Sequence, residues 1–120
     1  MLLQSLYQIS EFNSSGEEFS ATISFNPDHD IFKGHFPGQP VVPGVCLIHI
    51  VKELANMISG KQMLLQKGNS VKFLQLIDPR KGPEVIIKGK YSGKDESGMT
   101  ISATISNEEA AFFKFKGLFT

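Results

Sequence analysis

The 120-residue sequence has few of the features that mark specialised classes of protein. Its single cysteine, Cys46, excludes an intrachain disulfide. With 12 basic and 12 acidic residues its formal net charge is zero, whereas general binding to nucleic acid or to an anionic membrane requires a basic excess. The sequence shows neither the ~18-residue apolar run of a membrane-spanning helix nor the basic start and apolar stretch of a signal peptide. These absences predict a cytoplasmic protein without nucleic-acid or membrane partners.

Among the features that are present, 41% hydrophobic and 20% charged residues are ordinary for a globular protein. The length predicts one domain over 1–120, burying roughly two thirds of the unfolded surface. Apolar and polar residues alternate in the segments that flank the turn cluster NSSGE, which indicates a β-hairpin. The predicted strands are 4–12, 18–25, 69–77, 83–93, 99–106 and 110–119.

Residues 44–58, GVCLIHIVKELANMI, contain few helix breakers and are followed by Gly60, which predicts a helix of about four turns. Its polar residues fall at i, i+3, i+4 and i+7, so they form one narrow stripe. A helix this apolar must be covered on most sides by a curved sheet, by a partner subunit, or by both. The sequence therefore predicts an α+β domain with a curved antiparallel sheet around the helix. The stripe consists of His49, Lys52, Glu53 and Asn56.

The segment 33–45, KGHFPGQPVVPGV, holds His35 in a rigid loop just ahead of the helix. Its prolines fix their own φ and restrict the residues before them, while its glycines permit tight turns or close approach of a ligand. Such preorganisation benefits a reacting group more than a structural one. The alternative is that His35 only hydrogen-bonds a neighbouring carbonyl and pins the loop.

The stretch GHFPGQPVVPGV resembles the signature segment of the 3-hydroxyacyl-(acyl-carrier-protein) dehydratases, the hot-dog enzymes of fatty acid synthesis. Outside this loop the resemblance lies in the order of elements. It implies a hot-dog fold, a homodimer or an oligomer of dimers with shared sites, and no cofactor or metal. It also implies dehydration of a 3-hydroxyacyl thioester on acyl carrier protein to the trans-2-enoyl thioester.

By the same resemblance, His35 is the general base that removes the α-proton of the thioester. The backbone N–H of Gly44, near the positive end of the helix dipole, stabilises the enolate-like oxygen. Phe36, Pro43 and Val45 belong to the same segment and are expected to contact the substrate.

One position departs from the family pattern, which places a glutamate or aspartate on the helix fourteen residues after the loop histidine. That position is His49. In one account, His49 replaces the acid, either as an imidazolium or as the group that holds a water. In another, Glu53, one turn further along the helix, replaces the acid or pairs with His49 beside the substrate. Alternatively the site is impaired, and the chain binds acyl chains or completes a heterodimer with an active paralogue. The stripe is also compatible with a plain solvent-facing surface, whereas a thioesterase would need a water-activating carboxylate that position 49 does not supply.

An acyl chain needs an apolar channel, although ordinary core packing is the simpler explanation for each candidate wall residue taken alone. The acidic carrier protein needs a basic surface, for which loop residues Lys33, Arg80 and Lys81, with Lys52 and Lys72, are candidates; isolated solubilising lysines are the alternative. His29 lies between Asp28 and Asp30 without any zinc-binding spacing, so these acids are expected to shape a turn. The candidate channel residues are Phe32, Phe36, Val41, Val42, Ile48, Phe73 and Leu74.

Overall fold

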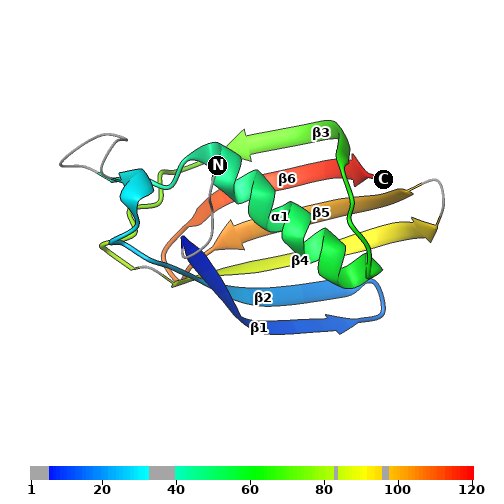
Figure 1. Cartoon of the computed structure of the whole chain (residues 1–120), viewed down its shortest axis with the longest axis horizontal. Helices are drawn as coiled ribbons and strands as arrows, with labels where there is room; N and C mark the ends of the chain where they lie inside the picture. Colours follow the sequence, from blue (N-terminus) through cyan, green and yellow to red (C-terminus); the bar gives the residue numbers. More distant parts are fainter. Residues whose placement is uncertain (1–5, 33–39, 83, 96–97) are drawn as a thin grey trace.

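The computed structural model describes residues 6–32, 40–82, 84–95 and 98–120. Within them, six strands form one antiparallel sheet in the order β1-β2-β4-β5-β6-β3. A single long helix, α1 (Gly44–Ser59), runs diagonally across one face of this sheet (Figure 1). The predicted α+β class is thereby confirmed. The remaining elements are β1 (Tyr7–Ser15), β2 (Glu18–Phe25), η1 (Asp30–Phe32), β3 (Leu65–Phe73), β4 (Glu84–Asp95), β5 (Gly98–Ser106) and β6 (Ala111–Phe119).

The core lies between α1 and the concave face of the sheet. Because successive side chains of a strand point to opposite faces, alternate apolar residues of β2, β4, β5 and β6 meet the helix. Ile50, Leu54 and Cys46 of α1 are fully buried, so Cys46 packs as a small apolar side chain. Full burial of a side chain such as Ile50 contributes about 1.5–3 kcal/mol.

The helix begins and ends as its flanking residues dictate. Pro43 precedes it with φ −61° and ψ 142°, outside the helical region, and Gly60 ends it in the left-handed region at φ 76°. The Gly60 N–H donates to the Asn56 carbonyl at 2.8 Å. No helix within the described residues is long and apolar enough to cross a membrane.

The predicted polar stripe of α1 is half-buried and has apolar neighbours at both ends. Val45 is 57% exposed and Met57 is 47% exposed. Val45 lies one turn before His49, and Met57 one turn after Glu53, on the same side of the helix. The sheet therefore leaves uncovered a strip of helix that is apolar at its ends and polar in its middle.

The prediction of a strand over 69–77 is corrected, because β3 runs from Leu65 to Phe73. The apolar residues after Phe73 leave the sheet: the N–H groups of Leu74 and Gln75 both donate to the Phe112 carbonyl, at 2.8 and 3.3 Å. The Ile77 carbonyl then accepts the Val42 N–H at 2.9 Å. This apolar segment contacts the residues that lead into the helix and does not extend the strand. An apolar sequence pattern alone does not distinguish a strand from such a segment.

Candidate functional site

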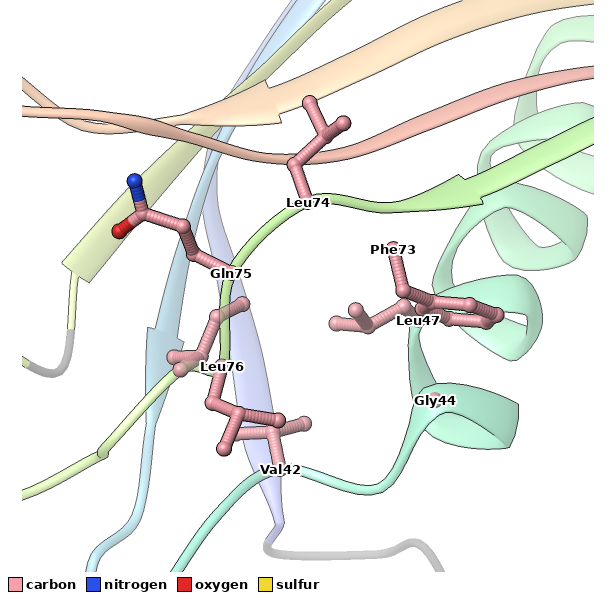
Figure 2. A pocket seen from close by; sticks show the side chains of 8 residues that line it. Val42, Gly44, Leu47, Phe73, Leu74, Gln75 and Leu76 are labelled. Atoms are coloured by element: carbon pink, nitrogen blue, oxygen red, sulfur yellow. The ribbon is translucent and has the colours of Figure 1, made fainter.

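A mostly apolar cavity of about 400 Å³ lies between the start of α1 and the segment that follows β3 (Figure 2). Among the described residues that line it, Gln75 alone has a polar side chain, and this side chain points away from Phe73 and Leu47. Three predicted channel residues, Val42, Phe73 and Leu74, line it, whereas Phe32 and Val41 are buried and Ile48 is half-buried outside it. The lining is Val42, Gly44, Leu47, Phe73, Leu74, Gln75, Leu76 and Ile77.

Gly44 lies directly against the aromatic ring of Phe73. A Cβ at position 44 would be 2.6 Å from Phe73 Cε1, so any larger residue there would require the Phe73 ring to shift. Phe73 itself is 56% exposed and its ring packs on Phe113, with centroids 5.1 Å apart. The Phe73 ring thus forms the wall of the cavity next to the start of α1.

The start of α1 can stabilise negative charge in this cavity. Pro43, at the N-cap, makes no side-chain capping hydrogen bond. The first N–H groups of any α-helix have no intrahelical partner, and the helix dipole adds partial positive charge there. The Gly44 amide is therefore where a developing oxyanion would be favoured.

A second, polar group of side chains lies on the uncovered side of the same helix. His49 Nε2 is 3.2 Å from Glu53 Oε1, an i, i+4 pair in which the side chains are 37% and 41% exposed. When Nε2 carries the ring proton, it can donate that proton to the Glu53 carboxylate. Nδ1 of His49 then remains for another partner.

Tyr7, on β1, is a member of this group that the sequence analysis missed. Its hydroxyl oxygen is buried and makes no hydrogen bond of regular geometry within the described residues. Burial raises the pKa of Tyr7, and the neighbouring Glu53 carboxylate raises it further, so the phenol stays protonated. Tyr7 belongs to the site only because it lies opposite the helix. The alternation of apolar and polar residues along a strand does not predict that position.

These two groups do not meet within one chain. Leu47 lines the cavity, and His49 lies two residues later, roughly 200° around the helix. Among the site predictions, Pro43 lies at the N-cap, half-buried, and Val45 is exposed beside the stripe. His35 and Phe36 lie outside the described residues. We call the first group the apolar half-site (Gly44, Phe73 and the cavity) and the second the polar half-site (Tyr7, His49 and Glu53).

The predicted basic residues are dispersed. Arg80 donates from Nε and Nη2 to the two carboxylate oxygens of Asp78, at 3.2 and 3.1 Å. This pairing lowers the pKa of Asp78 and partly neutralises the charge of Arg80. Lys81 is exposed nearby, Lys72 lies on the opposite face of the sheet from α1, and Lys33 lies outside the described residues.

Two further side chains, those of Asn26 and His29, take part in the turn before η1. The Asp28 N–H donates to Asn26 Oδ1 at 3.0 Å, and the Ile31 N–H donates to His29 Nδ1 at 3.0 Å. The side chains of Asn26 and His29 therefore help to shape this turn as hydrogen-bond acceptors.

Comparison with solved structures identifies the fold. The dehydratase heterocomplex ApeI:P from Xenorhabdus doucetiae superposes with a TM-score of 0.74 at 22% identity, over 93% of this chain and 96% of that one. A thioesterase from Haemophilus influenzae gives 0.66 at 14% identity, over 98% and 79%. At these identities the likeness establishes the hot-dog fold, which dehydratases and thioesterases share.

Sequence comparison then identifies the family. The profile of the ApeI-like family, described as ApeI dehydratase, matches residues 11–115, and the chain belongs to this family. The 3-hydroxyacyl-(acyl-carrier-protein) dehydratase FabZ of Rickettsia felis is 33% identical over 89 residues, covering 74% of this chain and 56% of the relative. FabZ of Pediococcus pentosaceus is 34% identical over 71 residues, covering 53% and 48%. The chain thus spans about half the length of the curated relatives it matches.

Proposed function

We propose that this protein dehydrates a 3-hydroxyacyl thioester, carried on acyl carrier protein, to the trans-2-enoyl thioester. The observation that carries the proposal is that Gly44, at the positive end of α1, lines a cavity whose described lining is mostly apolar. The family membership of the chain and the names of its FabZ relatives support the same reaction.

The working unit in this proposal is a dimer that pairs through β3. This strand forms one edge of the sheet, and its apolar side chains Leu65, Val71 and Phe73 are 38%, 37% and 56% exposed. An exposed apolar edge is a ready template for another strand. Because the two half-sites face different sides of α1, a second chain is also the simplest means of bringing a polar half-site to an apolar one.

In the proposed mechanism, His35 takes the α-proton while the Gly44 N–H stabilises the thioester oxygen as an enolate. His49 of the second chain acts as an imidazolium: its Nε2–H donates to Glu53 and its Nδ1–H protonates the 3-hydroxyl. The C–O bond then breaks and water leaves. Tyr7 neighbours Glu53, which in turn contacts His49, so Glu53 and Tyr7 position the imidazole and have no direct contact with the substrate.

The direct test is to incubate the purified protein with 3-hydroxyacyl-carrier proteins of several chain lengths and to detect the enoyl product. We expect turnover that is lost in His35→Ala and much reduced in His49→Ala. A His49→Glu variant faster than the wild type would show that the native site is compromised. Absence of turnover at every chain length would contradict the proposal.

A second candidate function is that of an impaired subunit, which binds acyl chains or completes a heterodimer with an active paralogue. The histidine at position 49 favours it, because the resemblance places a carboxylate there. In that case an encoded paralogue with a helix carboxylate should co-purify with this chain, and the mixed dimer, not the homodimer, should catalyse dehydration. A homodimer as active as the mixed dimer would exclude this role.

A further inference from the structure

The face of the sheet opposite α1 carries five exposed lysines in two adjacent rows. Lys114 shows the orientation: its neighbours Phe113 and Phe115 are buried on the helix side, so Lys114 points the other way. Strand register aligns the other residues with it across β4, β5, β6 and β3. We call this set the lysine lattice: Lys88, Thr104, Lys114 and Lys72 in the first row, and Lys90, Ser102, Lys116 and Ser70 in the second.

The lattice concentrates one sign of charge in a chain whose net charge is zero. Its eight positions hold five ammonium groups, three hydroxyls and no carboxylate, within roughly 14 Å by 7 Å. Lys72 and Lys114 are directly opposite in register, an arrangement of like charges that destabilises a sheet. The acid in contact with the lattice is Glu18 at its margin, 3.9 Å from Lys90.

The lattice also surrounds an open hollow in the surface. A hollow of about 340 Å³ runs over the lattice residues. The hydroxyls of Ser102 and Thr104 lie between lysines of neighbouring strands, where they can donate hydrogen bonds to the same anion as the ammonium groups. The repulsion within the lattice would be relieved by a ligand that presents several negative charges at once.

We propose that the lysine lattice docks an acidic α-helix of a partner protein, lying across the strands. Strands repeat every ~4.8 Å along each row, and one face of a helix presents a side chain about every 5.4 Å, so carboxylates on one helix face match the rows. A helix of about ten residues, at 1.5 Å per residue, spans the lattice. This surface lies on the opposite side of the sheet from α1 and its half-sites.

Other polyanions fit this face less well. A bilayer or a nucleic-acid duplex is broad, and it would also meet Glu11, Glu18 and Glu84, which point outward elsewhere on the same face. The sequence pI of about 6.8 is far below the values typical of nucleic-acid-binding domains. A second copy of this chain docked through the same face would place one lattice against another, and the two sets of ammonium groups would repel each other. A narrow helix can follow the rows and avoid the acids.

The test uses a fluorescein-labelled, alanine-rich 12-residue peptide with all its glutamates on one helical face, measured by fluorescence anisotropy in 50 mM salt. A peptide of the same composition with its glutamates distributed around the helix is the probe control. We expect the one-faced peptide to bind more tightly, and its binding to weaken strongly at 300 mM salt. Substituting Lys114→Ser together with Lys116→Ser should raise Kd roughly five-fold.

The matched protein control is Lys61→Ser together with Lys81→Ser, which removes the same two charges from exposed positions outside the lattice. Its Kd should stay within about two-fold of the wild type. Thermal melting checks the fold, and Lys114→Ser should melt at or above the wild-type temperature because it removes the like-charge pair with Lys72. Equal losses in both double variants, or equal binding of both peptides, would overturn the proposal. Tighter lattice-dependent binding to phosphatidylserine vesicles or to duplex DNA would also overturn it.

Discussion

The two edge strands of the sheet, β1 and β3, differ in how far their apolar side chains are exposed. At the β1 edge, the apolar side chains Ile9 and Phe12 turn inward and pack against the core, and a register shift after Ile9 interrupts the strand. At the β3 edge, Val71 and Phe73 remain exposed. Polar side chains and bulges are common protections of free edges, and exposed apolar edges are common pairing surfaces. The contrast indicates that β1 is built to stay free and β3 to be covered.

The two half-sites lie toward these two different edges of the sheet. Because α1 crosses the sheet diagonally, its start lies toward β3, where Phe73 closes the cavity, while Tyr7 of β1 reaches Glu53 further along the helix (Figure 1). The apolar half-site thus belongs to the edge that needs a partner, and the polar half-site to the edge that does not. A dimer through β3 is expected to complete the first with residues of the second.

The largest expected effect, on both mass and activity, comes from a charged residue that protects the β3 edge against pairing with another strand. Val71→Lys places a charge at the proposed pairing surface, and lysine on an edge strand opposes strand addition. We expect the sedimentation mass to halve and dehydratase activity to disappear, with the circular dichroism spectrum unchanged. Asn13→Lys, at an exposed position of β1, is the control and should keep the wild-type mass. An unchanged mass for Val71→Lys would place the dimer interface elsewhere.

The next effect tests the Gly44 amide without disturbing the helix. Proline is well accepted at the first helical position, and the ψ of 142° at Pro43 suits a residue that precedes proline. Gly44→Pro removes the N–H, and we expect kcat to fall about 100-fold, as on removing one oxyanion-hole donor. Gly44→Ala is the matched control, since both variants add a Cβ against the Phe73 ring and only proline removes the donor. Equal kcat values in the two variants would exclude the amide from the reaction.

Complementation tests whether the two half-sites come from different chains. Gly44→Pro and His49→Ala are each expected to be weakly active alone. After mixing and exchange of subunits, half of the dimers are mixed, and each of these has one intact site, so roughly a quarter of wild-type activity should appear. Recovery that stays at the level of the two variants measured separately would mean that each site lies within one chain.

The sequence correctly predicted the features of the fold that depend on a local pattern of residues. The start of α1 at Gly44 and the burial of Cys46 follow from periodicity and from the residues that stop a helix. The end of β3 at Phe73 cannot be predicted in this way, because the apolar residues after it fit the pattern of a strand as well as the lining of a cavity. Tyr7 could not be found either, since its meeting with Glu53 depends on how α1 crosses the sheet.

The smallest expected effect concerns Tyr7 and the pH dependence of stability. The folded state raises the pKa of Tyr7 above its ordinary value of 10.0, so above pH 10 the unfolded chain releases a proton that the folded chain retains. The free energy of unfolding therefore falls as pH rises through this range. Tyr7→Phe should flatten this fall between about pH 10 and 11 and, because it removes a buried hydroxyl that lacks a regular hydrogen bond, should leave stability at pH 7 unchanged or raised by up to ~1 kcal/mol. Urea unfolding at a series of pH values measures both. Tyr91→Phe is the control, because the Tyr91 hydroxyl instead donates to the Gly16 carbonyl at 2.7 Å. A pH slope altered equally by both variants would show that the burial of Tyr7 beside Glu53 is not the cause.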